Sequence, residues 1–285
     1  MGRVALAPLL LAVALVATAC GERSEPTGPD VSLYPVTIQT GRDRPLVVSG
    51  PARRVVALSD SAAATVRSLG TSVVGVPINR SGRIRFTALR RLRPDLIVAP
   101  AETDDLDLSR AADVTGVQPY VVPGGSIEEV ERAITQLGLL TGRPAEARGL
   151  VRTIEQRRAQ AHARLASSPI VTVFIDLGFF TTAPDHSLLA DLVTEARGRN
   201  VAATRTEPGP LDPADVVKLD PDVYLTTSES RLTLKELRRD PATRKLRAVT
   251  EGRFVVVDSD LLAPGPGVGD ALLQIARLLH PDAFR

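Results

Sequence analysis

A short pattern occurs twice in the chain, as LRPDLIVAP at residues 92–100 and as LDPDVYLTT at residues 219–227. In both copies a polar, helix-like segment ends, a Pro-Asp pair follows, and an apolar run begins. Proline ends a helix, and the residue before it is expected to be extended. An apolar run without polar alternation is typical of a strand buried on both faces of a parallel sheet. The repeat therefore predicts two lobes of similar construction.

Strand-like and helix-like segments alternate through the rest of the chain from residue 53. This alternation is typical of α/β proteins with parallel sheets. Seven strands are expected, at residues 54–59, 72–78, 95–100, 118–123, 170–176, 222–227 and 253–258. We therefore predict an α/β fold whose two lobes each contain a mostly parallel sheet flanked by helices.

One long helix is expected between the lobes. Pro144 suits a first helical turn, and apolar residues then recur at helical spacing as far as residue 166 without another proline. Such a helix would be ~35 Å long. We predict an N-terminal lobe at 33–143, a bridging helix at 144–167 and a C-terminal lobe at 168–285. A continuous helix would act as a stiff hinge and limit movement between the lobes. Ser126 and Glu129, three residues apart, predict a capping box at the start of the preceding helix.

The N-terminal segment is typical of an export signal. An apolar run from Val4 to Ala19 follows Arg3 and is shorter than the ~20 residues of a membrane span. It ends in VATAC, which resembles a lipobox with Cys20, the only cysteine, as the lipidation site. A generic signal peptide with an incidental cysteine is the alternative. We expect a signal peptide at 1–20, a flexible tether at 21–32, and a protein exported and anchored by lipid on the outer face of the cytoplasmic membrane.

Several classes of function are disfavoured by composition. A net charge of +2, 3% aromatic residues and no Trp argue against nucleic-acid binding. The three histidines, His162, His186 and His280, are far apart, and the chain lacks a G-x-S-x-G elbow, so an enzyme is not expected. Asp185 with His186 is the sole His–carboxylate pair in an expected loop, which is too little for a transition-metal site. No cofactor is expected, and the protein is expected to be a monomer.

Several segments, taken in order, resemble the cobalamin and ferric-siderophore family of ABC-transporter substrate-binding proteins. They are RRVVALSDSAAATVRSLGTSVVGV, LRRLRPDLIVAP, SIEEVERAITQLGLLTGRPAEA, RGRNVA, VVKLDPDVYL and RLLHPDAF. The resemblance covers nearly all of residues 33–285. It implies two lobes bridged by one long helix, a ligand held in the cleft between them, and delivery to a membrane permease. The implied ligand is a ferric siderophore, cobalamin or haem.

Candidate ligand-binding residues follow from the expected sheets. Ligands gather outside the carboxyl ends of parallel strands, so loops that follow strands should line the cleft. The candidates are Asp60, Asn79, Arg80, Glu102, Phe179, Phe180, Arg205, Glu229, Arg231 and Asp260.

Two residue types among these candidates suggest ligand chemistry. The arginines favour an anionic iron chelate, since guanidinium pairs well with carboxylate or catecholate oxygens; solvated loop arginines are the alternative. The scarcity of aromatic residues argues against a large corrin. The Phe179–Phe180 pair suits an apolar macrocycle, or packing into the core.

The chain departs from the family at the residues that bind the permease. The family's docking glutamates are matched here by Ala64 and Ala214, and Asp60 and Asp215 are the nearest substitutes. A shorter or shifted carboxylate would not give the same ion-pair geometry. A membrane-anchored scaffold or sensor with the same fold, which does not feed a standard importer, is therefore the alternative function.

Overall fold

The computed structural model describes residues 34–38, 45–202 and 210–285. The predicted signal peptide and tether, the lipidation site Cys20 and the candidate ligand residue Arg205 lie outside these ranges. Within the described ranges, no helix combines the length and apolarity needed to cross a membrane.

The first lobe contains a parallel sheet in the strand order β4-β3-β5-β6 and a small antiparallel pair, β1 with β2. Its elements, in chain order, are β1 (Val36–Ile38), β2 (Leu46–Val48), β3 (Val55–Ala57), α1 (Asp60–Ser68), β4 (Val73–Gly75), α2 (Phe86–Arg91), β5 (Leu96–Pro100), α3 (Asp105–Thr115), β6 (Pro119–Val122) and α4 (Ile127–Leu140).

The second lobe contains a parallel sheet in the order β10-β9-β7-β8. Its elements are β7 (Val171–Asp176), α6 (Leu188–Glu195), β8 (Gly198–Asn200), α7 (Pro213–Leu219), β9 (Val223–Thr227), η1 (Ser228–Ser230), α8 (Leu234–Arg239), α9 (Arg247–Thr250), β10 (Phe254–Val257), η2 (Ser259–Leu262), α10 (Val268–Leu279) and η3 (Pro281–Phe284). The predicted fold class, two lobes with parallel sheets flanked by helices, is confirmed.

The repeated Pro-Asp pattern marks equivalent positions in the two lobes. Asp95 precedes β5 and accepts hydrogen bonds of 2.8 Å from the backbone N–H groups of Arg53 and Arg54, just before β3. Asp222 precedes β9 and accepts from the N–H and the hydroxyl of Thr172 in β7, at 2.8 and 2.6 Å. Each carboxylate therefore fixes the start of the neighbouring parallel strand.

The backbone before each of these prolines differs from the prediction. Arg93 and Asp220 are left-handed, with φ of 43° and 36°, whereas an extended conformation was expected. Arg93 follows Leu92, the C-cap of α2, and Asp220 is itself the C-cap of α7; at both positions a left-handed residue turns the chain out of the helical path. At these two positions the helix ending outweighs the usual preference of a residue before proline.

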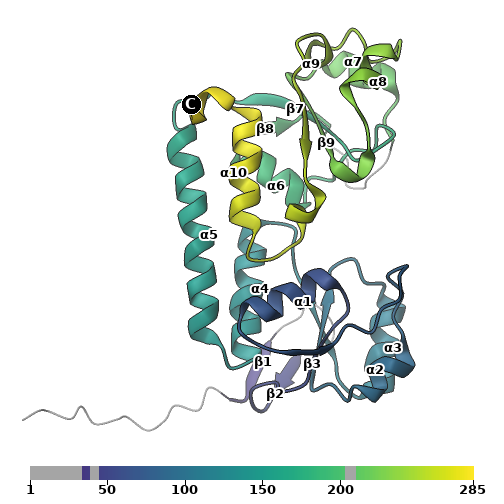
Figure 1. Cartoon of the computed structure of the whole chain (residues 1–285), viewed down its shortest axis with the longest axis vertical. Coiled ribbons are helices and arrows are strands. Elements are labelled where there is room, and N and C mark those ends of the chain that lie inside the picture. The colour runs from purple at the N-terminus through teal and green to yellow at the C-terminus, as the bar shows by residue number, and fades with distance from the viewer. Residues whose placement is uncertain (1–33, 39–44, 203–209) are drawn as a thin grey trace, which may run out of the picture. The chain divides into compact units, whose positions relative to one another are not determined.

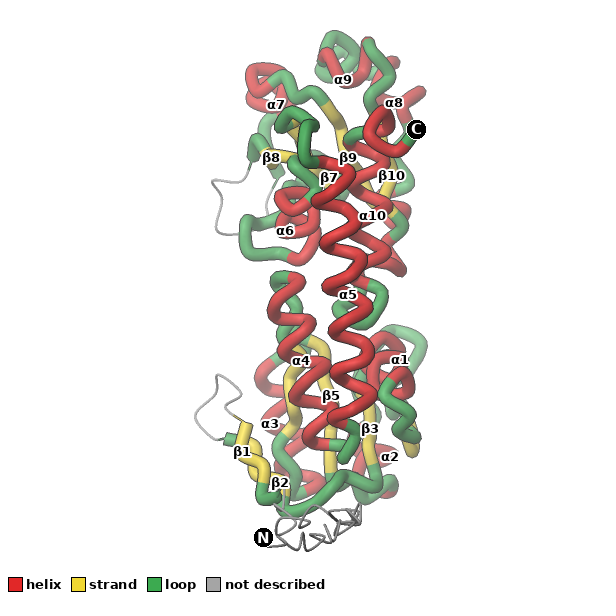
Figure 2. Tube along the Cα trace, turned by 90° about the vertical axis from the view of Figure 1, so that its left-hand side faces the viewer, coloured by secondary structure: helices red, strands yellow, loops and turns green. Residues whose placement is uncertain are grey.

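The long helix α5 (Pro144–Leu165) runs alongside both lobes (Figures 1 and 2). It packs against α4 of the first lobe and α10 of the second. Gly269 of α10 allows a close approach, since a Cβ there would lie 2.7 Å from the Cβ of Arg157. The largest hydrophobic core is continuous from Val55 in the first sheet through Ile154 of α5 to Val223 in the second. The lobes are therefore joined by a shared core as well as by one helix.

Candidate functional site

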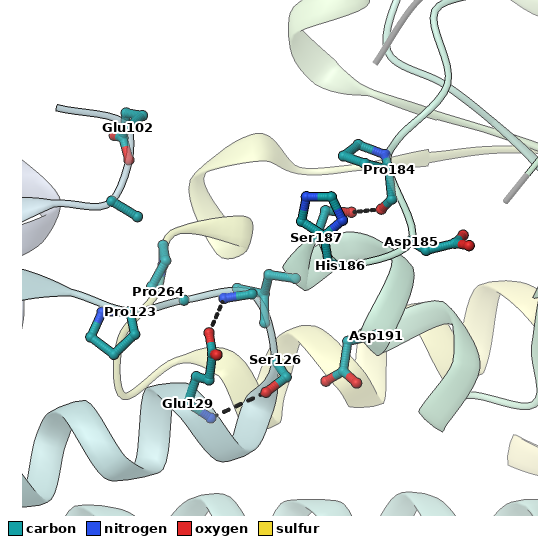
Figure 3. A pocket seen from close by; sticks show the side chains of 14 residues that line it. Glu102, Pro123, Ser126, Glu129, Pro184, Asp185, His186, Ser187, Asp191 and Pro264 are labelled. Atoms are coloured by element: carbon teal, nitrogen blue, oxygen red, sulfur yellow. Dashed lines mark hydrogen bonds between the residues drawn. The ribbon is translucent and has the colours of Figure 1, made fainter. Parts of the chain in front are cut away.

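A cavity of about 810 Å³ lies between loops of the two lobes (Figure 3). The loops after β5 and β6 contribute from the first lobe, and the segments that follow β7 and β10 contribute from the second. These are the carboxyl ends of the strands, where parallel sheets usually bind ligands. The volume is within the range of small-molecule sites. The lining residues are Ala101, Glu102, Pro123, Gly124, Gly125, Ser126, Glu129, Pro184, Asp185, His186, Ser187, Leu188, Asp191 and Pro264.

Two adjacent glycines allow the lobes to approach closely beside this cavity. A Cβ at Gly124 would lie 2.4 Å from the side chain of Pro264, and one at Gly125 would lie 2.7 Å from the carbonyl oxygen of His186. Both distances are far shorter than normal van der Waals contact, so any larger residue would push the second lobe away. Thr65 of α1 adds a hydroxyl hydrogen bond of 3.4 Å to the carbonyl of Pro264.

Four carboxylates line the cavity: Glu102, Glu129, Asp185 and Asp191. Glu129 accepts a hydrogen bond of 2.8 Å from the N–H of Gly125, and Asp191 accepts one of 2.8 Å from the N–H of Ile127. Burial raises the pKa of Asp191, and the repulsion of nearby Glu195 acts in the same direction. Glu102 and Asp185 are exposed, and the Asp185 carboxylate points away from Glu102 and Glu129 (Figure 3).

The start of α4 is capped differently from the predicted capping box. The Ser126 hydroxyl accepts from the N–H of Glu129 at 3.2 Å, as expected. The Glu129 carboxylate, however, accepts from Gly125 instead of from the N–H of Ser126. Asp191 of the second lobe accepts from a further N–H group at this helix end. The free N–H groups at the start of α4 are therefore bonded by side chains from both lobes.

The charge of the lining determines what the cavity attracts. Neither lysine nor arginine lines it among the described residues. A lining of carboxylates attracts hydrogen-bond donors and cations and repels anions. No group of three His, Cys, Asp or Glu residues in the described ranges is placed to hold a metal ion.

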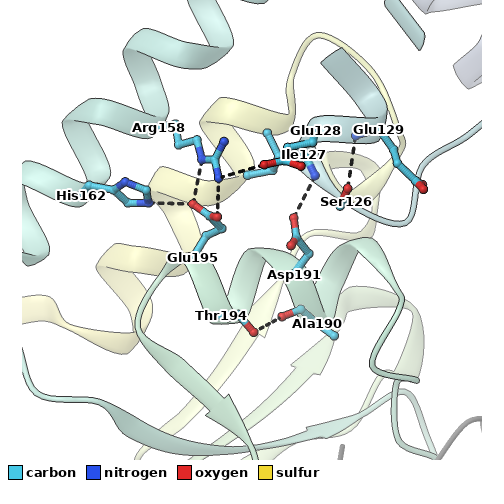
Figure 4. A network of polar contacts seen from close by, with 10 residues as sticks. All are labelled: Ser126, Ile127, Glu128, Glu129, Arg158, His162, Ala190, Asp191, Thr194 and Glu195. Carbon is cyan, nitrogen blue, oxygen red and sulfur yellow. Dashed lines mark hydrogen bonds and ion pairs between the residues drawn. The ribbon is translucent and has the colours of Figure 1, made fainter. Parts of the chain in front are cut away.

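A polar network beside the cavity connects α5, α6 and the start of α4 (Figure 4). The guanidinium of Arg158 donates two hydrogen bonds to the Glu195 carboxylate, at 2.6 and 2.8 Å. His162 Nε2 lies 2.7 Å from the same carboxylate, and Glu128 lies 4.0 Å from Arg158. Hydrogen bonding to Arg158 lowers the pKa of Glu195 below its ordinary value. The network thus fixes α6, which carries Asp191, against α5.

The structure brings few of the predicted ligand residues to this cavity. Glu102 lines it. Asn79 holds a turn, since its side-chain oxygen accepts from the N–H groups of Ser81 and Arg83 at 2.9 and 3.0 Å. The remaining described candidates on polar loops are exposed and outside the lining, namely Asp60, Arg80, Glu229, Arg231 and Asp260.

The two phenylalanines after β7 have different environments. Both are left-handed, with φ of 54° and 58°. Phe180 packs against the smaller core of the second lobe, whereas Phe179 is 95% exposed. The turn is fixed by buried Asp176, which accepts from the Tyr224 hydroxyl at 2.6 Å and from the N–H of Gly178 at 2.8 Å. An exposed aromatic held in such a backbone is a candidate contact for an apolar ligand surface.

The positions of the expected docking glutamates are on exposed surfaces. Ala64 lies on α1 and Ala214 on α7, and both are exposed. Asp60, at the start of α1, is exposed as well. The Asp215 carboxylate forms a salt bridge of 2.8 Å with the Lys218 ammonium group, so it is already paired.

Sequence reasoning missed most of the cavity. Glu129 was identified as a capping residue, and Asp185 with His186 as an insufficient metal pair, yet all three line the site. Their place in the sequence could have identified these residues, since the segment with Glu129 and the segment with Asp185 and His186 each follow a predicted strand. Asp191 gave no such signal, because it lies inside a helix and reaches the site by packing across the lobes.

The family described as Periplasmic binding protein matches residues 43–261, which is most of the chain. The chain belongs to this family. Periplasmic binding proteins of this kind are solute-binding proteins without catalytic activity, so the prediction that the protein is no enzyme is confirmed.

Individual proteins resemble the chain over most of its length. YvrC of Bacillus subtilis (strain 168), an uncharacterized ABC transporter substrate-binding lipoprotein, is 24% identical over 311 residues, covering 98% of this chain and 97% of YvrC. A cobalamin-binding protein of Halobacterium salinarum is 25% identical over 277 residues, which cover 87% of this chain and 74% of that protein. The structure of the periplasmic heme-binding protein BhuT with two hemes matches with a TM-score of 0.70 and 20% sequence identity. The match covers 83% of this chain and 100% of BhuT. The predicted family resemblance is therefore confirmed.

Proposed function

We propose that this protein is an extracytoplasmic lipoprotein that captures a corrinoid of the cobalamin type in the cavity between its lobes and delivers it to an ABC importer. Family membership supports a solute receptor. The Halobacterium relative is a cobalamin-binding protein and YvrC is an ABC transporter substrate-binding lipoprotein. Lipidation at Cys20, with a signal peptide at 1–20 and a tether at 21–32, agrees with the YvrC description.

The acidic lining of the cavity is the observation that carries the choice of ligand. Cobalamin has neutral amide groups around its ring, and amide N–H groups donate to carboxylates. Haem carries two carboxylates and catecholate iron complexes carry negative charge, so both would be repelled by the carboxylates that line the cavity. Of the three arginines that had favoured an anionic iron chelate, Arg80 and Arg231 lie outside the lining, and Arg205 lies outside the described residues. We therefore propose a corrinoid in place of the anionic iron chelate.

A thermal-unfolding screen tests the proposal. The mature chain from residue 20, with Cys20→Ser to remove the anchor, is measured alone and with cyanocobalamin, haemin, and ferric catecholate and hydroxamate siderophores. A ligand at a hundredfold its dissociation constant stabilises the fold by about 2.7 kcal/mol. Stabilisation by cyanocobalamin alone supports the proposal. Selective stabilisation by haemin or by a catecholate would show that the charge argument is wrong.

The exposed alanines favour a second candidate function. Ala64 and Ala214 present no carboxylate, and Asp215 is already paired with Lys218. A receptor that binds its ligand but acts as a scaffold or sensor, without feeding a standard importer, fits this surface. Co-purification with the permease encoded nearest to the gene distinguishes the two: a stable complex supports import through Asp60 and Asp215, and its absence supports the sensor.

A further inference from the structure

The edge of the first lobe opposite the cavity is held together by contacts between distant parts of the chain. The Tyr34 hydroxyl donates to the carbonyl of Leu139 at 2.7 Å, at the end of α4. The N–H of Ala52 donates to the carbonyl of Leu140 at 2.9 Å. The guanidinium of Arg54 donates to the carbonyl of Leu92 at 2.6 Å, at the end of α2. The chain therefore enters the described fold at the amino ends of the parallel strands, whereas the cavity lies at their carboxyl ends.

Five exposed arginines gather at this edge, and we call them the basal arginine surface: Arg53, Arg54, Arg90, Arg91 and Arg93. The last three line a groove of about 630 Å³, together with Thr87, Pro94, Val114 and Thr115.

The basal arginine surface carries little compensating negative charge. Asp95 accepts hydrogen bonds from the backbone N–H groups of Arg53 and Arg54, not from a guanidinium. Within the described part of the chain, none of the five guanidinium groups is in an ion pair. A basic last turn stabilises the end of α2, which accounts for Arg90 and Arg91. Arg54 supports the same helix end, since its guanidinium donates to the carbonyls of Leu92 and Arg93. Neither role accounts for Arg53 or Arg93, which lie outside that helix.

We propose that the basal arginine surface binds the anionic phospholipid headgroups of the membrane that holds the lipid anchor. This inference rests on the proposed lipidation of Cys20. The segment from Cys20 to Tyr34 spans at most about 50 Å, and it joins the fold at the edge that carries the arginines. Clusters of exposed basic residues next to an anchor are attracted by anionic lipid. This contact turns the cavity, on the opposite edge, away from the bilayer and open to solute.

Vesicle co-sedimentation of the anchor-free mature chain (Cys20→Ser) tests the surface separately from the anchor. Vesicles of phosphatidylcholine alone are compared with vesicles that also contain phosphatidylglycerol, at about 50 mM and about 500 mM salt. The wild type should bind the anionic vesicles and be released at high salt. The variant Arg90→Gln/Arg91→Gln/Arg93→Gln should lose about a hundredfold in partitioning. A milder variant, Arg53→Gln/Arg91→Gln, should give an intermediate loss.

A charge-matched control keeps the test specific. Arg152→Gln/Arg164→Gln/Arg244→Gln removes the same charge from exposed positions on α5 and the second lobe, and it should bind like the wild type. No binding by the wild type, or equal losses in the basal and control variants, would overturn the proposal. Ligand-induced stabilisation in the same samples reports separately on the receptor function, because no basal arginine lines the cavity. Mass analysis of the membrane-bound protein reports separately on Cys20.

Discussion

Asp191 of α6 accepts a hydrogen bond of 2.8 Å from the backbone N–H of Ile127, the first residue of α4. A side chain of the second lobe thereby satisfies a helix end of the first, at the edge of the cavity. Apolar residues of α4 and α6 belong to the same hydrophobic core as well. The lobes are therefore joined beside the cavity by this hydrogen bond and by buried apolar side chains.

Replacement of Asp191 should weaken this junction. Asp191→Ala leaves the N–H of Ile127 without its acceptor and should lower the free energy of unfolding by about 1–2 kcal/mol. Asp191→Asn keeps an accepting oxygen and removes a charge whose burial is unfavourable. It should therefore lower the free energy of unfolding by less than half as much as Asp191→Ala does. Urea unfolding at neutral pH measures both. Asp185→Asn, at an exposed position, is the control and should change little; equal stability of Asp191→Ala and wild type would contradict the assigned role.

The Glu195 network should make stability depend on pH. The pKa of Glu195 is lowered in the folded protein, chiefly by its hydrogen bonds with Arg158, so its contribution is complete at neutral pH and is lost as the pH falls through the lowered pKa, below the ordinary value of 4.5. Glu195→Gln should lower the free energy of unfolding by about 1–2 kcal/mol at pH 7, allowing for partial exposure of the pair. The difference from wild type should shrink at pH values below 4.5.

Urea titrations across the acidic range measure this difference. Glu128→Gln is the matched control, because Glu128 lies 4.0 Å from Arg158 with a side chain that is 70% exposed. It should change stability by less than about 0.5 kcal/mol. A Glu195→Gln effect that stays constant with pH would show that the charge of Glu195 is not its source.

The close approach at Gly124 should not tolerate a side chain. In Gly124→Ala the new Cβ would lie 2.4 Å from Pro264, so the second-lobe loop must shift, at a cost of about 1–3 kcal/mol. Gly50→Ala is the control, since nothing lies within 4 Å of a Cβ at that position. Thermal unfolding should separate the two variants, and ligand affinity should fall only in Gly124→Ala. Equal melting temperatures would show that the loop containing Pro264 can shift without loss of stability.

Ligand binding should move the lobes little. The helix α5 packs against α4 and α10 along both lobes, and the main core is continuous across them, so closure would require repacking of buried side chains. Small-angle scattering profiles of the free and ligand-bound protein should coincide within their error. A marked contraction on ligand addition would indicate a hinge that this packing does not allow.

The fold could be predicted because its signals are local. All seven strands expected from apolar runs are present, and the first residue of α5 is the predicted Pro144. The strand β8 was missed because its residues, Gly198–Asn200, are not apolar; it forms by pairing with β7. The short strands β1 and β2 likewise depend on each other and gave no strong signal.

The candidate site was less predictable because it depends on contacts between lobes. The rule that loops after strands face the cleft identified Glu102. It could not indicate that Asn79 would be used within its own turn, or that Phe180 would pack into a core. Asp191 and Pro264 reach the cavity only through the tertiary arrangement. The charge of the cavity, acidic where arginines were expected, follows from which loops meet there.

Calorimetric titration of cyanocobalamin and haemin, each into the wild type and into the variant Glu102→Arg/Asp185→Arg, tests the central claim most directly. The wild type should bind cyanocobalamin and reject haemin. Charge reversal in the cavity should weaken cyanocobalamin binding by about tenfold or more and allow haemin to bind, while Glu229→Arg/Asp260→Arg, at exposed positions outside the cavity, should leave both affinities unchanged. Tight haemin binding by the wild type, or cyanocobalamin binding unaffected by reversal inside the cavity, would contradict the account.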